Sequence, residues 1–173
     1  MELDAGSHAK ATGFQLLASS TQPETMSSAM RDDFRSEMCI SGTPAELPLI
    51  AEFVDDACEQ AAINPGIRFD LQLAVEEACM NVIEHAYGGK GGEFTVCIEI
   101  SGPDAQITVT DHGRPFDPAE VPLPNLGLPL EERPIGGLGI FLMQQLMDEV
   151  EFDFSANGNQ LRMVKRGVRS ETG

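Results

Sequence analysis

The sequence predicts an α+β fold: a two-layer sandwich with helices on one face of a mixed, mostly antiparallel sheet. Three observations support this prediction. Apolar residues recur with the helical period in three segments, and apolar and polar residues alternate in five others. Turn-forming residues separate these segments in the order β-α-α-β-β-loop-α-β-β. A chain of 173 residues is long enough for one domain with its own core.

The first half of the predicted domain contains one strand and two helices. "FRSEMCISG" (Phe34–Gly42) alternates as a strand does, and a helix is expected to begin near Thr43 or Pro44. Its apolar face consists of Leu47, Ile50, Val54, Ala57, Cys58 and Ala61. "NPG" (Asn64–Gly66) separates this helix from a second one, expected over Asp70–Tyr87 and ended by two glycines.

The second half contains two predicted hairpins and a third helix. "EFTVCIEISG" and "AQITVTDHG" alternate with period two, and the turn at Gly102–Asp104 between them indicates an antiparallel hairpin. "GLGIFLMQQLMDEV" is predicted to be a helix. Its apolar face contains Ile140, Met143, Leu146, Met147 and Val150. The closing segment "EVEFDFSANGNQLRMVKR" is typical of a hairpin with Asn-Gly-Asn at its turn.

A long loop interrupts this pattern between Arg114 and Gly136. It holds six of the eleven prolines and has no hydrophobic period. A loop of about twenty residues inside a compact domain is usually functional, often as a lid over a site. The predicted organisation is therefore a mobile leader over residues 1–32, a domain over 33–167 that includes this lid, and a tail over 168–173.

The composition excludes several classes of function. The net charge is -17, and residues 1–30 account for only one lysine and three acidic side chains of it. An acidic domain repels phosphate backbones, which argues against binding to nucleic acid or to anionic membranes. The charge is equally compatible with a partner protein that carries basic patches and with simple solubility.

The cysteines and the apolar runs favour a cytoplasmic protein. The four cysteines, Cys39, Cys58, Cys79 and Cys97, are 18 to 21 residues apart, with no CxxC pair. Reduced core thiols are therefore expected, in place of a zinc site or a redox pair. The start of the chain lacks the pattern of a signal peptide, and no apolar run approaches the roughly 18 residues of a membrane span.

The first motif with chemical potential lies on the second helix. Glu77, Asn81 and His85 follow one another at intervals of four residues, so they form a polar line beside the buried face. For the glutamate alone, a solvated helix edge is the simpler interpretation. Asparagine, however, is a mediocre helix former whose side-chain oxygen suits Mg²⁺, and a carboxylate one turn away can act as a general base.

The second motif is "TVTDHGRPFD", where Asp111 ends a strand and Gly113 follows it. A carboxylate at a strand end often only caps the turn. In a binding site it can accept a hydrogen bond from the exocyclic amine of adenine, and the glycine lets the backbone approach the base closely.

The third motif, "GGLG" (Gly136–Gly139), opens the third helix. Free N–H groups at a helix N-terminus, with no side chains in the way, form a site suited to phosphates. Such a cluster is often only a flexible hinge. It is neither a Walker motif nor a Rossmann fingerprint, since no Gly-Lys-Ser/Thr follows it and no strand directly precedes it.

The three motifs, taken in this order with a lid before the glycine box, resemble the Bergerat ATP-binding fold of the GHKL superfamily. Within it, "EEACMNVIEHAYGG", "DHGRPFDP" and "GGLGIFLMQQLMDEV" are most similar to the boxes of the anti-sigma factor serine/threonine kinases. The similarity covers about residues 34–166. It implies a histidine-kinase-like ATPase domain, a two-layer sandwich with an ATP lid.

The resemblance assigns a role to each residue of the first motif. It implies that Asn81 coordinates the Mg²⁺ that bridges the ATP phosphates, and that Glu77 is the base for the attacking hydroxyl. It makes His85 a candidate for contact with a phosphate or with the lid. Kinase catalysis of this kind consists mainly of positioning and charge neutralisation, so one base, one metal ion and one lid are sufficient.

The resemblance also assigns the nucleotide contacts. Asp111 would bind the adenine amino group, with Gly113 packed near the base. Arg133, at the end of the lid, is a candidate contact to the γ-phosphate. The backbone N–H groups implied in phosphate binding belong to Gly137, Leu138 and Gly139.

The function implied by the resemblance is that of a cytoplasmic, ATP-dependent protein serine kinase. Such a kinase acts as an anti-sigma factor in a partner-switching system: it phosphorylates a STAS-domain antagonist and sequesters a sigma factor. Homodimerisation, here through the sheet and the first helix, follows only by analogy.

Other functions stay open or are disfavoured at this stage. The domain could bind partners in response to nucleotide without transferring phosphate, or could be a partner-switching kinase with a non-sigma target. The catalytic domain of a histidine kinase is disfavoured because no pair of dimerising helices precedes the motifs. ATPases of the gyrase and mismatch-repair type are disfavoured because no transducer domain follows.

Overall fold

The structure, a computed structural model, describes residues 33–115, 137–155 and 157–169. The predicted leader and nearly all of the predicted lid lie outside these residues. The observed elements are β1 (Phe34–Ser41), η1 (Pro44–Glu46, a 3-10 turn), α1 (Leu47–Gln60), α2 (Pro65–Asn81), η2 (Val82–Ala86, a π-helix), β2 (Glu93–Ser101), β3 (Asp104–Asp111), α3 (Leu138–Leu146), β4 (Glu149–Ser155) and β5 (Gly158–Lys165). Their order confirms the predicted one.

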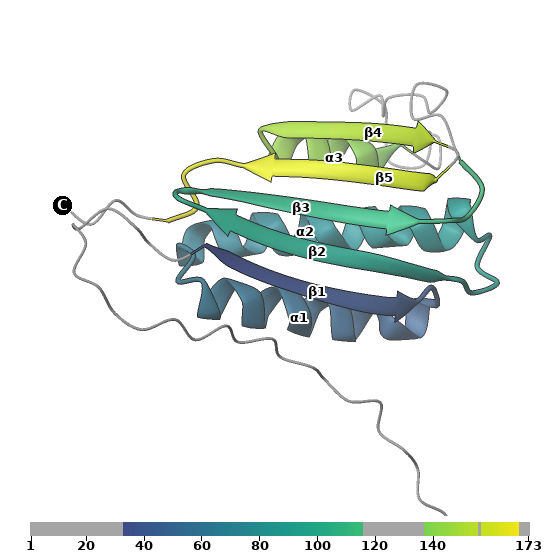
Figure 1. The fold of residues 1–173 in the computed structure, drawn as a ribbon, viewed down its shortest axis with the longest axis horizontal. Helices are drawn as coiled ribbons and strands as arrows, with labels where there is room; N and C mark the ends of the chain where they lie inside the picture. The colour runs from purple at the N-terminus through teal and green to yellow at the C-terminus, as the bar shows by residue number, and fades with distance from the viewer. Residues whose placement is uncertain (1–32, 116–136, 156, 170–173) are drawn as a thin grey trace, which may run out of the picture.

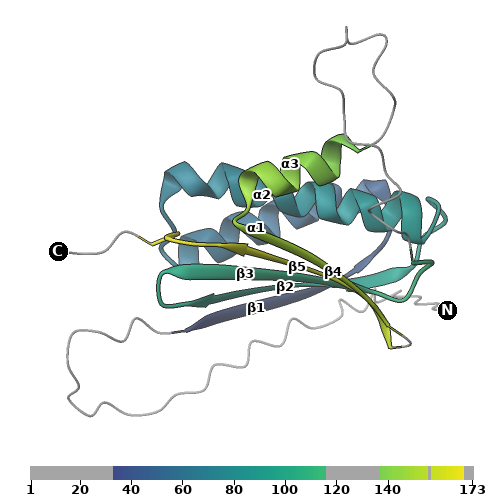
Figure 2. The ribbon, with the colours of Figure 1, turned by 90° about the horizontal axis from the view of Figure 1, so that it is seen from above.

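The five strands form one sheet in the order β1-β2-β3-β5-β4 (Figure 1). Every pairing among the described residues is antiparallel. Figure 2 shows that α1, α2 and α3 all lie on the same side of this sheet. The fold is therefore the predicted α+β sandwich of two layers, and the described residues place no helix on the other face of the sheet.

Alternation along the strands builds the core between the two layers. In β3, Ala105, Ile107 and Val109 are buried and face the helices, and Asp111 occupies the next helix-facing position. The paired positions of β5 begin with Asn159 and continue with Leu161 and Met163. The helix-facing rows are thus aliphatic along most of the sheet and become polar at the end of β3.

Helix α2 begins five residues before the position predicted from the sequence. The "NPG" segment is the start of the helix, and not a separator: the Asn64 side chain accepts a hydrogen bond from Gly66 N at 2.9 Å. Pro65 occupies the first turn, where its missing N–H costs nothing. The backbone N–H of Asn64 donates to Val168 O at 2.8 Å, which ties the helix start to the end of the chain.

The continuous helix predicted over residues 70–87 is interrupted at Asn81. From Val82 to Ala86 the chain forms a π-helix, whose wider turn is rare and is often found at functional sites. Periodicity could not reveal it, because Val82, Ile83 and Ala86 are buried as an α-helix would also require.

Helix α3 is shorter than predicted. It ends at Leu146, Met147 adopts an extended conformation, and Val150 belongs to β4. The Lys165 ammonium donates to the carbonyl of Leu146, which satisfies a C-terminal backbone group of the helix. The helix therefore ends at Leu146, where it contacts β5, although its apolar pattern continues to Val150.

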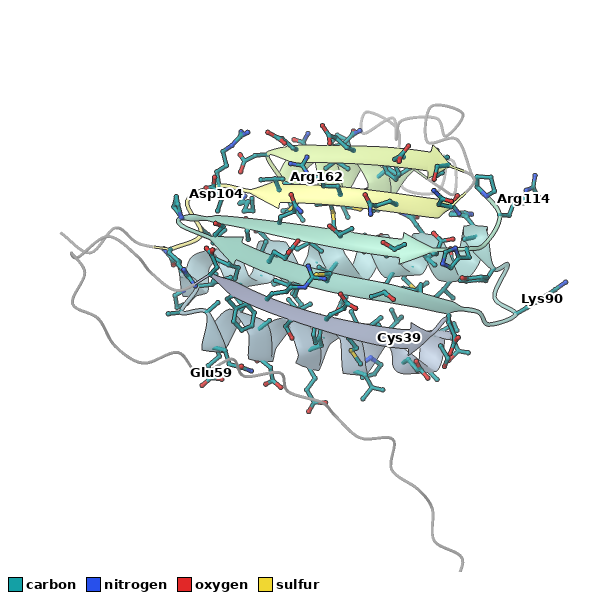
Figure 3. The ribbon with its side chains drawn as sticks, viewed as in Figure 1. Cys39, Glu59, Lys90, Asp104, Arg114 and Arg162 are labelled. Atoms are coloured by element: carbon teal, nitrogen blue, oxygen red, sulfur yellow. The ribbon has the colours of Figure 1, made fainter. Side chains whose placement is uncertain are left out.

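The sheet face without helices is lined by paired charges. Arg35 bridges Glu37 and Glu99, each at 2.6 Å, and Arg162 contacts Glu151 at 2.8 Å. Figure 3 shows Arg162 on this face. One cysteine prediction was wrong here: Cys39 is exposed on its strand, whereas Cys58, Cys79 and Cys97 are buried, and all four thiols are free.

The packed region continues past residue 167. Val168 is fully buried, its N–H donates to Pro103 O at 2.7 Å, and Arg169 Nε donates to Ala61 O at 2.8 Å. This segment joins the β2–β3 turn to the end of α1. Within the part of the chain that the structure describes, each helix is too short or too polar to cross a lipid bilayer.

Replacing the residue that caps α2 tests how that helix begins. Asn64→Ala removes the acceptor for Gly66 N and is expected to lower the free energy of unfolding by about 1 kcal/mol. Asn64→Asp keeps an acceptor and serves as the matched control. Urea denaturation compares the two, and equal stabilities for both variants would contradict the cap.

Candidate functional site

A hollow lies between the C-terminal end of α2 and the end of the sheet formed by β3, β4 and β5. It brings together residues that are up to 83 positions apart in the chain. Its walls are formed by Ala78, Asn81, Val82, Ala86, Val109, Asp111, Phe152, Phe154, Asn159, Gln160 and Leu161. The lining is mainly apolar with a few convergent polar groups, as in sites that bind small organic ligands.

Asp111 is the only carboxylate among these lining residues, and it is 6% exposed. Its Oδ1 atom accepts two hydrogen bonds of 2.8 Å, one from the backbone N–H of Gly113 and one from the side chain of Asn159. These bonds fix the plane of the carboxylate. The second oxygen, Oδ2, can then accept a hydrogen bond from a ligand's amino group.

Asn159 is a site residue that the sequence reasoning missed. It pairs directly with Asp111 across β3 and β5, is 7% exposed, and also donates to the carbonyl of Gly113 at 3.1 Å. The "NGN" segment by itself predicts only a turn. The available signal was its asparagine at a helix-facing strand position, where the pattern calls for an apolar residue.

Gly113 lies directly against the end of the π-helix. A Cβ atom at this position would be 2.7 Å from the carbonyl oxygen of Ala86, so only glycine fits without a shift of the backbone. The next N–H, that of Arg114, donates to the same carbonyl at 2.9 Å. The Tyr87 hydroxyl donates to Glu93 O at 2.6 Å and accepts from His112 N at 3.2 Å. These contacts hold the helix end against the strand end.

Asn81 lines the hollow from the last turn of α2. Its side-chain nitrogen is buried and has no hydrogen-bond partner among the described residues. A buried amide with unused polar capacity is the condition expected of a ligand contact. Rotation of the amide presents its oxygen, which suits Mg²⁺. Among the described residues, no three His, Cys, Asp or Glu side chains gather into a metal site.

Glu77 lies one turn before Asn81, beside the start of α3. A Cβ atom on Gly139 would be 2.5 Å from Glu77 Oε2, so this glycine makes room for the carboxylate. Burial raises the pKa of Glu77, and the nearby carboxylates of Glu76 and Glu84 raise it further. A raised pKa makes this carboxylate a stronger proton acceptor than an ordinary glutamate.

The other predicted site residues that the structure describes do not line the hollow that contains Asn81 and Asp111. His85 is exposed on the π-helix and is not among the residues that line the hollow. Gly137 has a left-handed backbone (φ 78°) and caps α3, and Leu138 is 51% exposed at its first position. Arg133 lies outside the described residues.

The comparisons with known proteins agree with this fold. Residues 40–165 match the family described as "Histidine kinase-like ATPase domain". This match covers more than half of the chain, and the protein therefore belongs to that family. The family match confirms the superfamily inferred from the three motifs.

Curated relatives narrow the comparison. The chain is similar to the serine-protein kinase RsbW of Halalkalibacterium halodurans, at 37% identity over 107 residues, which covers 59% of this chain and 64% of that protein. The RsbW protein of Bacillus cereus is 34% identical over 86 residues, covering 47% of this chain and 54% of that protein. The chain thus spans between half and two thirds of the length of these relatives. Both relatives are named as serine-protein kinases.

A solved structure supports the fold. The crystal structure of the RsbU and RsbW domains of a Mycobacterium tuberculosis protein matches with a TM-score of 0.56 and 15% sequence identity. The match covers 76% of this chain and 32% of that one. At this identity the likeness concerns the fold alone.

The raised pKa of Glu77 predicts a pH-dependent gain of stability when its charge is removed. The folded state holds this proton to a higher pH than the unfolded state, so the carboxylate destabilises the fold once the pH rises through the raised pKa. Glu77→Gln should therefore raise the melting temperature by about 1–3 °C at pH 8 and change it little at pH 4. Glu59→Gln, at an exposed position of α1, is the matched control, and an equal gain for Glu77→Gln at both pH values would contradict the prediction.

Removing the Asn159 amide should lower the free energy of unfolding. Asn159→Ala leaves the buried Asp111 carboxylate with one donor fewer, which is expected to cost about 1–3 kcal/mol of unfolding free energy. Asn159→Asp, which places two carboxylates side by side, should cost more. Denaturant titration at pH 7.5 measures both variants; unchanged stability in Asn159→Ala would show that the amide does not support Asp111.

Proposed function

We propose that this protein is an ATP-dependent protein serine kinase. The observation that carries the proposal is the convergence of the three motifs: Asp111 and Asn81 face one hollow, and Glu77 lies beside Gly139 one turn away. Each motif alone has a simpler structural interpretation. Together they would supply a pocket for the base, a polar group beside it and, one turn outside the hollow, a proton acceptor. The curated relatives named as serine-protein kinases support the same reaction.

Asp111 would recognise adenine. The two donors on Oδ1 leave Oδ2 as a hydrogen-bond acceptor, which suits the exocyclic amine of adenine. Guanine carries a carbonyl oxygen at the equivalent ring position, and a carboxylate repels it. The site should therefore prefer ATP over GTP.

The phosphates would extend from the base toward the start of α3. The first N–H groups of a helix are free to bind anions, and Gly137 and Gly139 keep side chains away from them. Asn81 would hold a Mg²⁺ ion, which when bound would neutralise phosphate charge. Arg133 and His85 are proposed as further phosphate contacts.

Glu77 would accept the proton of the attacking serine hydroxyl. Its carboxylate needs to be ionised for this step, and its raised pKa moves the acid limit of activity above that of an ordinary glutamate. The neighbouring Glu76 projects about 100° away around the helix and does not share this edge.

The partners follow from the same resemblance. The proposed substrate is a STAS-domain antagonist protein, and the proposed second partner is a sigma factor that the kinase sequesters, with a homodimer as the working assembly. A partner-switching kinase with a non-sigma target would use the same site chemistry.

A transfer assay tests the reaction. The protein is incubated with Mg²⁺, γ-labelled ATP and an extract of its source cells depleted of its own copy. The wild type should place acid-stable serine label on a small protein. Glu77→Gln should lower the labelling rate by at least about 100-fold because it lacks the base.

Two controls make the assay decisive. Glu59→Gln, at an exposed position of α1, should keep its activity, and ATP binding by Glu77→Gln should match that of the wild type. If every variant binds ATP and none labels a protein, the kinase proposal fails and a nucleotide-dependent binding module becomes the better description.

A further inference from the structure

We infer that Phe154, supported by Phe152, forms an aromatic wall of the hollow that contacts the purine ring of the nucleotide. This inference rests on the proposed function, because it takes ATP to be the ligand. Neither residue belongs to the three sequence motifs, and both are contributed by β4, an edge strand of the sheet.

Strand register places Phe154 in the same row as the adenine-binding carboxylate. Asp111 of β3 pairs with Asn159 of β5, and Asn159 pairs with Phe154 of β4. The three residues therefore follow one another across the helix-facing side of the sheet. In the next row, Val109 pairs with Leu161, and Leu161 pairs with Phe152.

The width of this row suits a bicyclic base. Two strand spacings of about 4.8 Å each separate the backbones of β3 and β4, which gives about 10 Å between Asp111 and Phe154. A purine whose amino group reaches Asp111 extends across β5 toward β4. The residue that it meets at the far side is the phenylalanine.

The two phenylalanines differ in burial in a way that fits this role. Their rings are stacked, with centroids 6.3 Å apart and planes at 19°. Phe152 packs against the hydrophobic core, whereas Phe154 is 38% exposed and lines the hollow. Phe152 thus supports the ring of Phe154, whose exposed surface lies in the same row as Asp111 and Asn159. The face of a purine can cover that surface.

The hairpin that carries Phe154 is held tightly against the site. Gly158 has a φ of +124°, and a Cβ atom there would be 2.8 Å from both Asp111 O and His112 Nδ1. The start of β5 therefore lies against the end of β3 without an intervening side chain. This contact fixes the distance between the wall and the carboxylate.

Nucleotide affinity measured on four variants tests the wall. Phe154→Ala should weaken ATP and ADP binding by the same factor, about 10-fold to 100-fold, because the lost contact is to the base. Phe154→Tyr should bind within about 2-fold of the wild type, and Phe154→Leu should lie between them. Phe69→Ala removes a 67% exposed aromatic of α2 outside the hollow and should bind normally. Calorimetric titration with Mg²⁺ present gives each dissociation constant.

The outcomes separate this inference from the proposed function. If the wild type binds ATP and Phe154→Ala binds it equally well, Phe154 does not contribute to binding of the base. The aromatic-wall inference is then wrong, and the kinase proposal stands. If Phe154→Leu matches the wild type, the ring's aromatic face is not used and the inference is also wrong. A wild type that binds no ATP overturns both. A melting temperature of Phe154→Ala close to that of the wild type confirms that the loss is local.

Discussion

The geometry of the candidate site depends on the close approach of Gly113 to Ala86. The absence of a side chain at position 113 lets the end of β3 lie on the last turn of the π-helix, and the Arg114 N–H closes the contact with a hydrogen bond of 2.9 Å. Asn81 and Asp111 face one hollow because this contact joins the helix layer to the sheet at that end. A larger residue there would separate the two layers.

On the helix-facing side of the sheet, polar residues replace aliphatic core residues at the end next to the candidate site. The paired residues Val109 and Leu161 belong to the aliphatic core. The next helix-facing pair toward the end of β3 is Asp111 with Asn159. A buried carboxylate is costly unless hydrogen bonds replace its water, and here two donors do so. The same donors orient the carboxylate, so one arrangement satisfies both the stability requirement and the requirement of the proposed binding role.

The acidic character of the chain has a consequence at the proposed base. The pKa of Glu77 is raised by burial and by the carboxylates of Glu76 and Glu84. Elsewhere, on the sheet face without helices, acidic side chains are paired with Arg35 and Arg162. The acidic groups therefore serve two purposes: on the sheet they form a solvated, paired surface, and on α2 and the π-helix they make the Glu77 carboxylate a stronger proton acceptor.

The sequence by itself determined the type and order of the elements and the three motifs, because hydrophobic period and short polar motifs are local properties. Only the tertiary structure decided where elements begin and end: Asn64 caps a helix that is tied to the chain's end, and α3 stops where Lys165 meets its last carbonyl. The role of Asn159 and the exposure of Cys39 also depend on neighbours from other strands. Partners distant in the chain leave no local pattern, so these features could not be predicted from the sequence.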